Sequence, residues 1–255
     1  MPKRIVSLDY CTDQFVLKLA DRDQIAALSP DADRKFSYMR DAARGAPKVR
    51  AAAEEVMALK PDLVVRYYGG GSAMGDLLQR AGIPVVQLGV AEGLDGVRHN
   101  VRQMANAFGH PKRGEALIAQ MDQRIAAAGL HPTGLFALYM SQGGVIAGAG
   151  TPVDEMLHAA GLKNFTQTPG WTPIPLEALA YHQPDIVAGA FFGSAGKPAA
   201  IWSAARHPVA QRQLTERPSV MLDGAATACG GWFIADAIEA LSATARSAKV
   251  AKANP

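Results

Sequence analysis

The sequence predicts an α/β protein of two Rossmann-like lobes joined by one long α-helix. Two observations predict this fold. Short apolar runs alternate with amphipathic stretches along the 255 residues, which is typical of βα units. One βα pattern also occurs twice, once in each half of the chain. We therefore expect a first lobe at residues 1–110, a connecting helix at 111–129 and a second lobe at 130–255.

The elements of the first half follow from its apolar runs and their boundaries. Strands are expected at 4–8, 25–28, 63–68 and 84–88, and helices at 13–19, 52–59, 73–81 and 94–108. Thr12 or Asp13 is expected to cap the first helix, since a short polar side chain can accept hydrogen bonds from its first N–H groups. Pro61 ends the second helix, and Gly82 caps the third.

The connecting helix is expected at 112–128, where apolar residues recur close to the helical period. The second half then repeats the plan of the first. Strands are expected at 135–140, 145–147, 185–188 and 220–222, and helices at 152–160, 176–179, 209–214 and 233–245. The tail from Ser247 to Pro255 is small and polar, so we expect it to be frayed.

The repeated pattern consists of a glutamate, a short apolar helix, Pro-Asp and a strand. Pro61 follows Glu54 by seven residues, and Pro184 follows Glu177 by seven. Two unrelated βα units can share such a pattern by chance. We prefer two equivalent lobes, each with a carboxylate at the start of a short helix, where the helix dipole favours negative charge.

Composition excludes several classes of protein. The net charge is only +3 and no run of Lys or Arg occurs, which argues against a nucleic-acid partner. No stretch reaches the roughly 18 apolar residues of a membrane span. The N-terminus enters the first strand without an apolar leader, so the protein is either cytoplasmic or has lost a leader. Cys11 and Cys229 lie far apart in sequence and are expected to be separate thiols, and they can bridge only if the fold brings their Cα atoms within about 7 Å.

Several segments, in order, resemble one protein family. Residues 4–8 are similar to its opening strand, 54–64 to its "E-x-x-x-x-L-K-P-D-L-V" segment, 81–86 to the entry of its next strand, and 147–164 to its "A-G-x-G-T … A-G-x-x-N" segment. The family is the class III, helical-backbone substrate-binding proteins of ABC importers, which includes vitamin B12, ferric-siderophore and haem carriers. The resemblance spans nearly the whole chain.

This resemblance implies a ligand cleft between two lobes with little hinge motion. It also implies a monomeric periplasmic carrier, with a removed leader or a lipid anchor, that has no enzymatic activity and no cofactor. Glu54 and Glu177 match the positions at which the family docks onto arginines of an ABC permease dimer. Each glutamate can instead simply favour its own helix N-terminus.

The ligand is expected to bind in loops that follow strand ends. The predicted ligand-binding residues are Tyr10, Tyr38, Arg50, Arg66, Tyr67, Tyr68, Trp171, Phe192 and Trp232. Aromatic faces with a few polar groups suit a large metal chelate, which predicts a ferric siderophore or cobalamin. Haem is an alternative, with Tyr10 or Tyr38 as axial ligand. For Trp232 a core position, and for the two arginines an ordinary ion pair, are equally open.

Two other kinds of site have weaker support. The six histidines show no metal-ligand spacing, so no protein-held metal is expected. Gly69, Gly71 and Gly75 follow a strand and precede a helix, as in dinucleotide-binding enzymes. However, this strand is not the first, and the next strand ends without an acid to hold a ribose. No set of nucleophile and base is evident either. A Rossmann enzyme is therefore the less favoured alternative.

Overall fold

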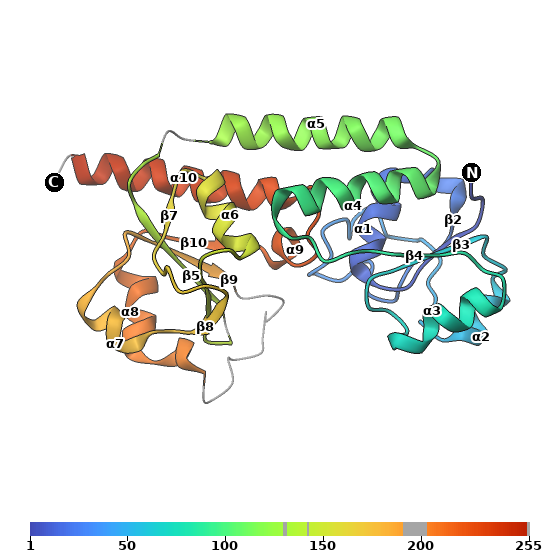
Figure 1. Cartoon of the computed structure of the whole chain (residues 1–255), viewed down its shortest axis with the longest axis horizontal. Helices are drawn as coiled ribbons and strands as arrows, with labels where there is room; N and C mark the ends of the chain where they lie inside the picture. Colours follow the sequence, from blue (N-terminus) through green and yellow to red (C-terminus); the bar gives the residue numbers. More distant parts are fainter. Residues whose placement is uncertain (130–131, 142, 191–202, 254–255) are drawn as a thin grey trace. The chain divides into compact units, whose positions relative to one another are not determined.

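The structure is a computed structural model of the chain, and it divides into two compact units (Figure 1). It describes residues 1–129, 132–141, 143–190 and 203–253. The first unit comprises Met1–Ala91, Asp95–Ala119 and Cys229–Trp232, and the second comprises Glu92–Leu94, Gln120–Ala228 and Phe233–Pro255. The change between units after Ala119 falls inside helix α5 (Pro111–Ala128), the predicted connecting helix.

The first unit contains a four-stranded parallel sheet with the strand order β2-β1-β3-β4. Its elements are β1 (Ile5–Ser7), α1 (Tyr10–Leu19), β2 (Ile25–Ala27), α2 (Ala53–Ala58), β3 (Leu63–Arg66), α3 (Gly71–Arg80), β4 (Val85–Gln87) and α4 (Gly93–Phe108). Helices α2 and α3 cover one side of the sheet, and α1 and α4 lie on the other (Figure 1). On the α2–α3 side, Val6, Val64 and Leu78 are among the fully buried core residues.

The second unit contains a six-stranded sheet. Its elements are β5 (Phe136–Ser141), β6 (Val145–Ala147), α6 (Pro152–Ala159), β7 (Lys163–Asn164), β8 (Trp171–Pro173), α7 (Leu176–Tyr181), β9 (Ile186–Ala190), α8 (Pro208–Glu216), β10 (Ser219–Leu222), α9 (Gly224–Thr227) and α10 (Ile234–Ala253). Alternate residues of β5 face opposite cores: Tyr139 packs with residues of α6 and α10, while Leu138 and Met140 pack with residues of α7 and α8.

The two units share one strand arrangement. Strands β10, β9, β5 and β7 pair side by side in parallel, as β4, β3, β1 and β2 do in the first unit. The aspartate of the Pro-Asp dipeptide makes the same two backbone contacts in both units. Asp62 accepts the Arg4 N–H at 2.8 Å and donates its own N–H to the Arg4 carbonyl. Asp185 makes the same pair of contacts with Phe136, its side chain accepting at 2.8 Å. The duplication predicted from the sequence is therefore present in the fold.

Some local predictions were wrong. Asp9, rather than Thr12 or Asp13, caps α1, and its side chain accepts the Thr12 N–H. The last helix continues to Ala253 instead of fraying from Ser247, because its alanines and lysines are good helix formers. Trp171 lies in a short strand, β8, that pairs antiparallel with β6. Among the described residues, no helix is both long and apolar enough to cross a bilayer.

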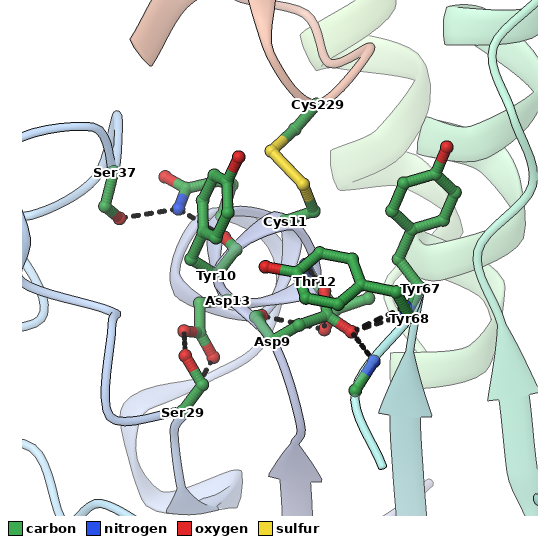
Figure 2. The surroundings of a disulfide bond; sticks show 12 residues. Asp9, Tyr10, Cys11, Thr12, Asp13, Ser29, Ser37, Tyr67, Tyr68 and Cys229 are labelled. Carbon is green, nitrogen blue, oxygen red and sulfur yellow. Dashed lines mark hydrogen bonds between the residues drawn. A yellow bond between two sulfur atoms is a disulfide. The ribbon is translucent and has the colours of Figure 1, made fainter. Parts of the chain in front are cut away.

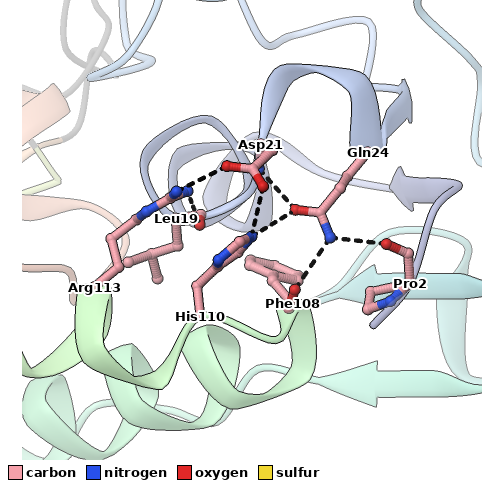
Figure 3. Close-up of polar contacts among 7 residues, drawn as sticks. All are labelled: Pro2, Leu19, Asp21, Gln24, Phe108, His110 and Arg113. Atoms are coloured by element: carbon pink, nitrogen blue, oxygen red, sulfur yellow. Dashed lines mark hydrogen bonds and ion pairs between the residues drawn. The ribbon is translucent and has the colours of Figure 1, made fainter.

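A polar cluster attaches the start of α5 to the first unit (Figure 3). The Nε2 atom of His110 lies 3.1 Å from the Asp21 carboxylate and 2.9 Å from Gln24 Oε1. Arg113 donates to Asp21 at 2.7 Å and to the Leu19 carbonyl at 2.5 Å. These contacts fix the amino end of α5 to the end of α1, whose last residue is Leu19.

Cys11 and Cys229 form a disulfide, so the expectation of two separate thiols was wrong. Their Cα atoms lie 5.1 Å apart, although 218 positions separate them in the sequence. The reason is topological: between α9 and α10 the chain returns to the first unit with Cys229–Trp232. Figure 2 shows Cys229 on this return loop facing Cys11 on α1.

We expect replacement of both cysteines by serine to lower the free energy of unfolding by about 2–5 kcal/mol, the usual loss for a native disulfide. Urea unfolding of wild type and double variant measures the difference. A reductant should destabilise the wild-type protein and leave the double variant unchanged. Two freely labelled thiols in the folded, unreduced wild type would contradict the disulfide.

Candidate functional site

Aromatic side chains gather where β1 and β3 end in the first unit. The rings of Tyr10 and Phe36 meet edge to face with centroids 4.8 Å apart, and those of Tyr10 and Tyr68 lie 6.1 Å apart. Tyr67 contacts Tyr68 at 5.9 Å. We call these four residues the tyrosine cluster. Tyr68 remains 51% exposed, so the cluster presents an aromatic face to solvent.

Asp9 positions the loop that carries this cluster. Its buried carboxylate accepts the backbone N–H groups of Tyr67 at 2.7 Å, Tyr68 at 3.1 Å and Gly69 at 3.0 Å (Figure 2). The other oxygen accepts the Thr12 N–H at 3.1 Å. Hydrogen bonds to an ionised carboxylate are stronger than those between neutral groups. One side chain therefore joins the start of α1 to the loop after β3.

Gly69 is required for this loop to approach β1. A Cβ atom at this position would lie 2.3 Å from the Leu8 carbonyl oxygen, which the backbone cannot accommodate. The following Gly70 has φ of +80°, a left-handed conformation that favours glycine. The backbone geometry of this loop therefore explains why glycine occurs at positions 69 and 70. This explanation weakens the interpretation of the glycines as a dinucleotide-binding site.

Two phenols of the cluster, those of Tyr10 and Tyr68, have raised pKa values. Burial raises the pKa of Tyr10 above its ordinary value, and the nearby Asp9 carboxylate raises it further. The same two causes raise the pKa of Tyr68. Neutral phenols offer apolar faces together with hydroxyl groups that can donate or accept a hydrogen bond.

Tyr38 lies in a second aromatic group of the same unit. Its ring meets that of Trp232 edge to face at 6.3 Å, and Trp232 packs on Phe15 at 5.6 Å. Trp232 is 6% exposed, so its ring is part of the packed interior of the first unit. Gln14 fixes the loop around Tyr38, since it accepts the Met39 N–H at 2.5 Å. The disulfide at Cys229 fixes the loop Cys229–Trp232, which carries the Trp232 side chain.

Asp13 ties α1 to the loop after β2. Ser29 donates to its carboxylate from the backbone at 3.1 Å and from the hydroxyl at 2.5 Å (Figure 2). Burial raises the pKa of Asp13 to about 7, although the Ser29 hydrogen bonds oppose this shift. Asp9 and Asp13 therefore join α1, which begins at Tyr10, to the loops after β3 and β2.

The two predicted ligand-binding arginines have different surroundings. Arg50 is exposed and forms an ion pair with Glu55. Arg66, the last residue of β3, is only 6% exposed. Its Nε atom is buried without a hydrogen-bond partner. Arg66 directly precedes Tyr67 of the tyrosine cluster in the sequence, whereas Arg50 is not adjacent in sequence to any residue of the cluster.

The remaining predicted residues lie in other places. Trp171 is 54% exposed on the second unit and meets Tyr139 edge to face at 6.0 Å. Phe192 lies outside the described residues. Glu54 and Glu177 are exposed in the first turns of α2 and α7. No hydrogen bond or ion pair joins either carboxylate to another described residue, so both are open to a partner.

Within the described part of the chain, no group of three or more His, Cys, Asp and Glu residues could hold a metal ion.

Comparison with known proteins gives the family. A family model described as periplasmic binding protein matches residues 5–198. The chain belongs to this family. Its membership implies a periplasmic location and a role in binding. The predicted family and the two-lobed α/β fold are thus confirmed.

Solved structures with the same fold cover almost the whole periplasmic binding protein. The haem-binding protein RhuT from Roseiflexus sp. RS-1 is 23% identical, with a TM-score of 0.72 over 98% of this chain and 100% of that one. A possible iron-binding protein from Staphylococcus epidermidis is 19% identical, with a TM-score of 0.75 over 95% and 98%. The vitamin B12 binding protein BtuF of Vibrio cholerae is 16% identical, with a TM-score of 0.65 over 97% and 98%. These likenesses show the fold.

Sequence reasoning missed two parts of this site. Phe36 lies in a polar stretch whose pattern indicates a loop or a short helix, and only tertiary structure brings it to Tyr10. Asp9 was overlooked because Thr12 and Asp13 also suit a helix N-cap. The available signal was the position of Asp9 between a buried strand and the first apolar residues of α1.

We expect Asp9→Ala to lower the free energy of unfolding by roughly 3 kcal/mol, because it leaves several backbone N–H groups near the loop without their acceptor. Urea denaturation measures the loss, and Asp23→Ala, at an exposed site in the same unit, is the control. An unchanged urea midpoint for Asp9→Ala would show that the carboxylate does not hold the loop.

Proposed function

We propose that this periplasmic binding protein captures a metal-chelate nutrient, a ferric siderophore or cobalamin, and delivers it to an ABC permease. The observation that carries the proposal is the half-exposed tyrosine cluster, held by Asp9 at the carboxyl ends of two parallel strands. Ligands of α/β sheets bind at such strand ends. Aromatic rings with a few hydroxyl groups suit a large ligand with both apolar and polar surface.

Haem is the second candidate. Tyrosine is one of the residues that bind haem iron, and the tyrosine cluster supplies three phenols at one place. Several proteins with the same fold are named as haem-binding, RhuT among them. These names support haem as a ligand to test beside the other chelates. The predicted cleft between the lobes stays a prediction.

The disulfide supports the proposed compartment by a separate argument. Disulfides persist in oxidising compartments, including the bacterial periplasm, and are rare in the cytosol. A bridge between Cys11 and Cys229 therefore agrees with export of the mature chain.

Permease docking is proposed to use Glu54 and Glu177. Each is an exposed carboxylate on a six-residue helix followed by the repeated Pro-Asp step. Exposed carboxylates can form charge-assisted, bidentate pairs with arginines of a partner. Such pairs orient a complex and accelerate its formation more than they strengthen it.

The ligand proposal is tested by titrating the purified protein with cyanocobalamin, ferric haem and a ferric hydroxamate siderophore, followed by fluorescence and thermal unfolding. We expect one chelate to bind and Tyr68→Ala to weaken its binding by about 1–3 kcal/mol, the scale for burying an apolar side chain. Tyr181→Ala is the matched control, since Tyr181 is 85% exposed on the second unit. Binding by none of the three probes would contradict the proposal.

The docking proposal is tested with the double variant Glu54→Ala and Glu177→Ala, produced in cells in place of the natural protein. We expect chelate uptake to fall at least tenfold while the purified variant binds its ligand normally. Asp76→Ala with Glu92→Ala removes one exposed carboxylate from each unit and serves as control. Normal uptake by the Glu54 and Glu177 variant would refute the docking role.

A further inference from the structure

We infer that Glu177 and Tyr181 together form a recognition site for one arginine side chain of a protein partner, on the exposed face of α7. The carboxylate pairs with the guanidinium, and the aromatic ring provides a surface on which the guanidinium stacks. That the partner is the ABC permease rests on the proposed function, whereas the preference for arginine rests on these two side chains alone. The inference adds an aromatic contact to a docking role that otherwise depends on charge.

The two side chains lie on one face of α7. Glu177 is the second residue of this six-residue helix and Tyr181 is the last, so they are separated by the spacing at which helical side chains are neighbours. Large side chains in helices lean toward the amino end, which brings a ring at position 181 toward Glu177. Leu179, on the opposite face, is buried in the core with residues of β5 and β9.

Neither side chain has a partner within its own unit. Tyr181 is 85% exposed, more than any other large hydrophobic residue in the described part of the chain. No ring contact or side-chain hydrogen bond joins Tyr181 to another described residue, and no ion pair joins Glu177 to one. Glu177 is also the only charged residue of α7. A guanidinium can therefore contact both groups without displacing an existing interaction.

The chemistry of this pair favours arginine over lysine. A guanidinium is planar, donates two parallel hydrogen bonds to one carboxylate and stacks on aromatic rings. An ammonium is a compact, strongly hydrated charge that gains less from a ring face. At an exposed site, a cation on an aromatic ring raises affinity by a factor of about two to five. Tyrosine also has only two side-chain torsions, so ordering its ring costs little.

The duplicated helix of the first unit lacks the ring. Glu54 is the second residue of α2, but the last position of that helix holds Ala58, where α7 has Tyr181. The chain's own Arg50 already pairs with Glu55 on α2. Among the residues that the structure describes, no ion pair involves α7. The fold common to both units therefore does not require an aromatic residue at this position.

The preference for arginine is tested on the purified chain, without permease or chelate. The tyrosines are replaced by 3-fluorotyrosine, and the fluorine resonance of Tyr181 is identified by its loss in Tyr181→Phe. We expect N-acetyl-arginine amide to shift this resonance at least about twofold more than N-acetyl-lysine amide does at the same concentration. Glu177→Gln should abolish the difference, and Glu92→Gln, at another exposed carboxylate of the second unit, should retain it.

Equal shifts from the two amides would overturn the arginine site. A preference for arginine that survives in Glu177→Gln would also overturn it, by showing that the ring acts without the carboxylate.

The permease as partner is tested by uptake in cells in which the amount of this protein limits transport. The probe is whichever of cyanocobalamin, ferric haem and the ferric hydroxamate siderophore the purified protein binds. We expect Tyr181→Ala to lower uptake about two- to fivefold, the factor for one exposed contact between a cation and a ring. Tyr181→Phe should retain uptake because it keeps the ring, whereas Tyr181→Leu should behave like Tyr181→Ala. All three variants should bind the probe as the wild type does.

Normal uptake by Tyr181→Ala, or by Tyr181→Leu, would overturn the role of the ring in recognising a permease arginine. Normal uptake by the double variant Glu54→Ala and Glu177→Ala, with the arginine preference of the purified chain intact, would contradict permease docking and leave the arginine site standing. Impaired uptake by that double variant, with no arginine preference in the purified chain, would support docking and overturn the arginine site.

Discussion

One buried carboxylate organises the candidate site. Asp9 accepts four backbone N–H groups, one from the start of α1 and three from consecutive residues after β3. A neutral amide has only one accepting oxygen, whereas a carboxylate has two and donates nothing, so it can satisfy both sets. The Asp9 contacts hold the tyrosine backbones, which leaves the rings for other contacts. Tyr10 and Tyr68 can therefore meet edge to face and still present an aromatic surface.

The periodic parts of the fold could be predicted because they depend on local patterns. Strand β3, helix α4 and the connecting helix α5 follow directly from apolar spacing and from Pro and Gly boundaries. The disulfide could not be predicted, because the pairing of Cys11 with Cys229 depends on a loop that returns from the second unit to the first. Of the site, Tyr10, Tyr67 and Tyr68 were found from their places after strand ends, while Phe36 depends on tertiary packing.

The two units share part of their structure and differ in the rest. What they share is strand order, the Pro-Asp contact and an exposed glutamate on a short helix. What they do not share is the chemistry at the strand ends: the tyrosine cluster and Arg66 belong to the first unit, whereas the second adds the antiparallel strands β6 and β8, on which Trp171 lies.

The return loop also has a consequence for biogenesis. Because Cys229–Trp232 completes the first unit, that unit is discontinuous in sequence. An N-terminal segment emerging from a ribosome or a translocon lacks Trp232, the ring on which Phe15 and Tyr38 pack, and lacks the partner of Cys11. Domains usually mature in the order in which they are synthesised. Here the first unit can be completed only after residues 229–232 have been delivered, so its disulfide cannot form until most of the second unit has also been synthesised.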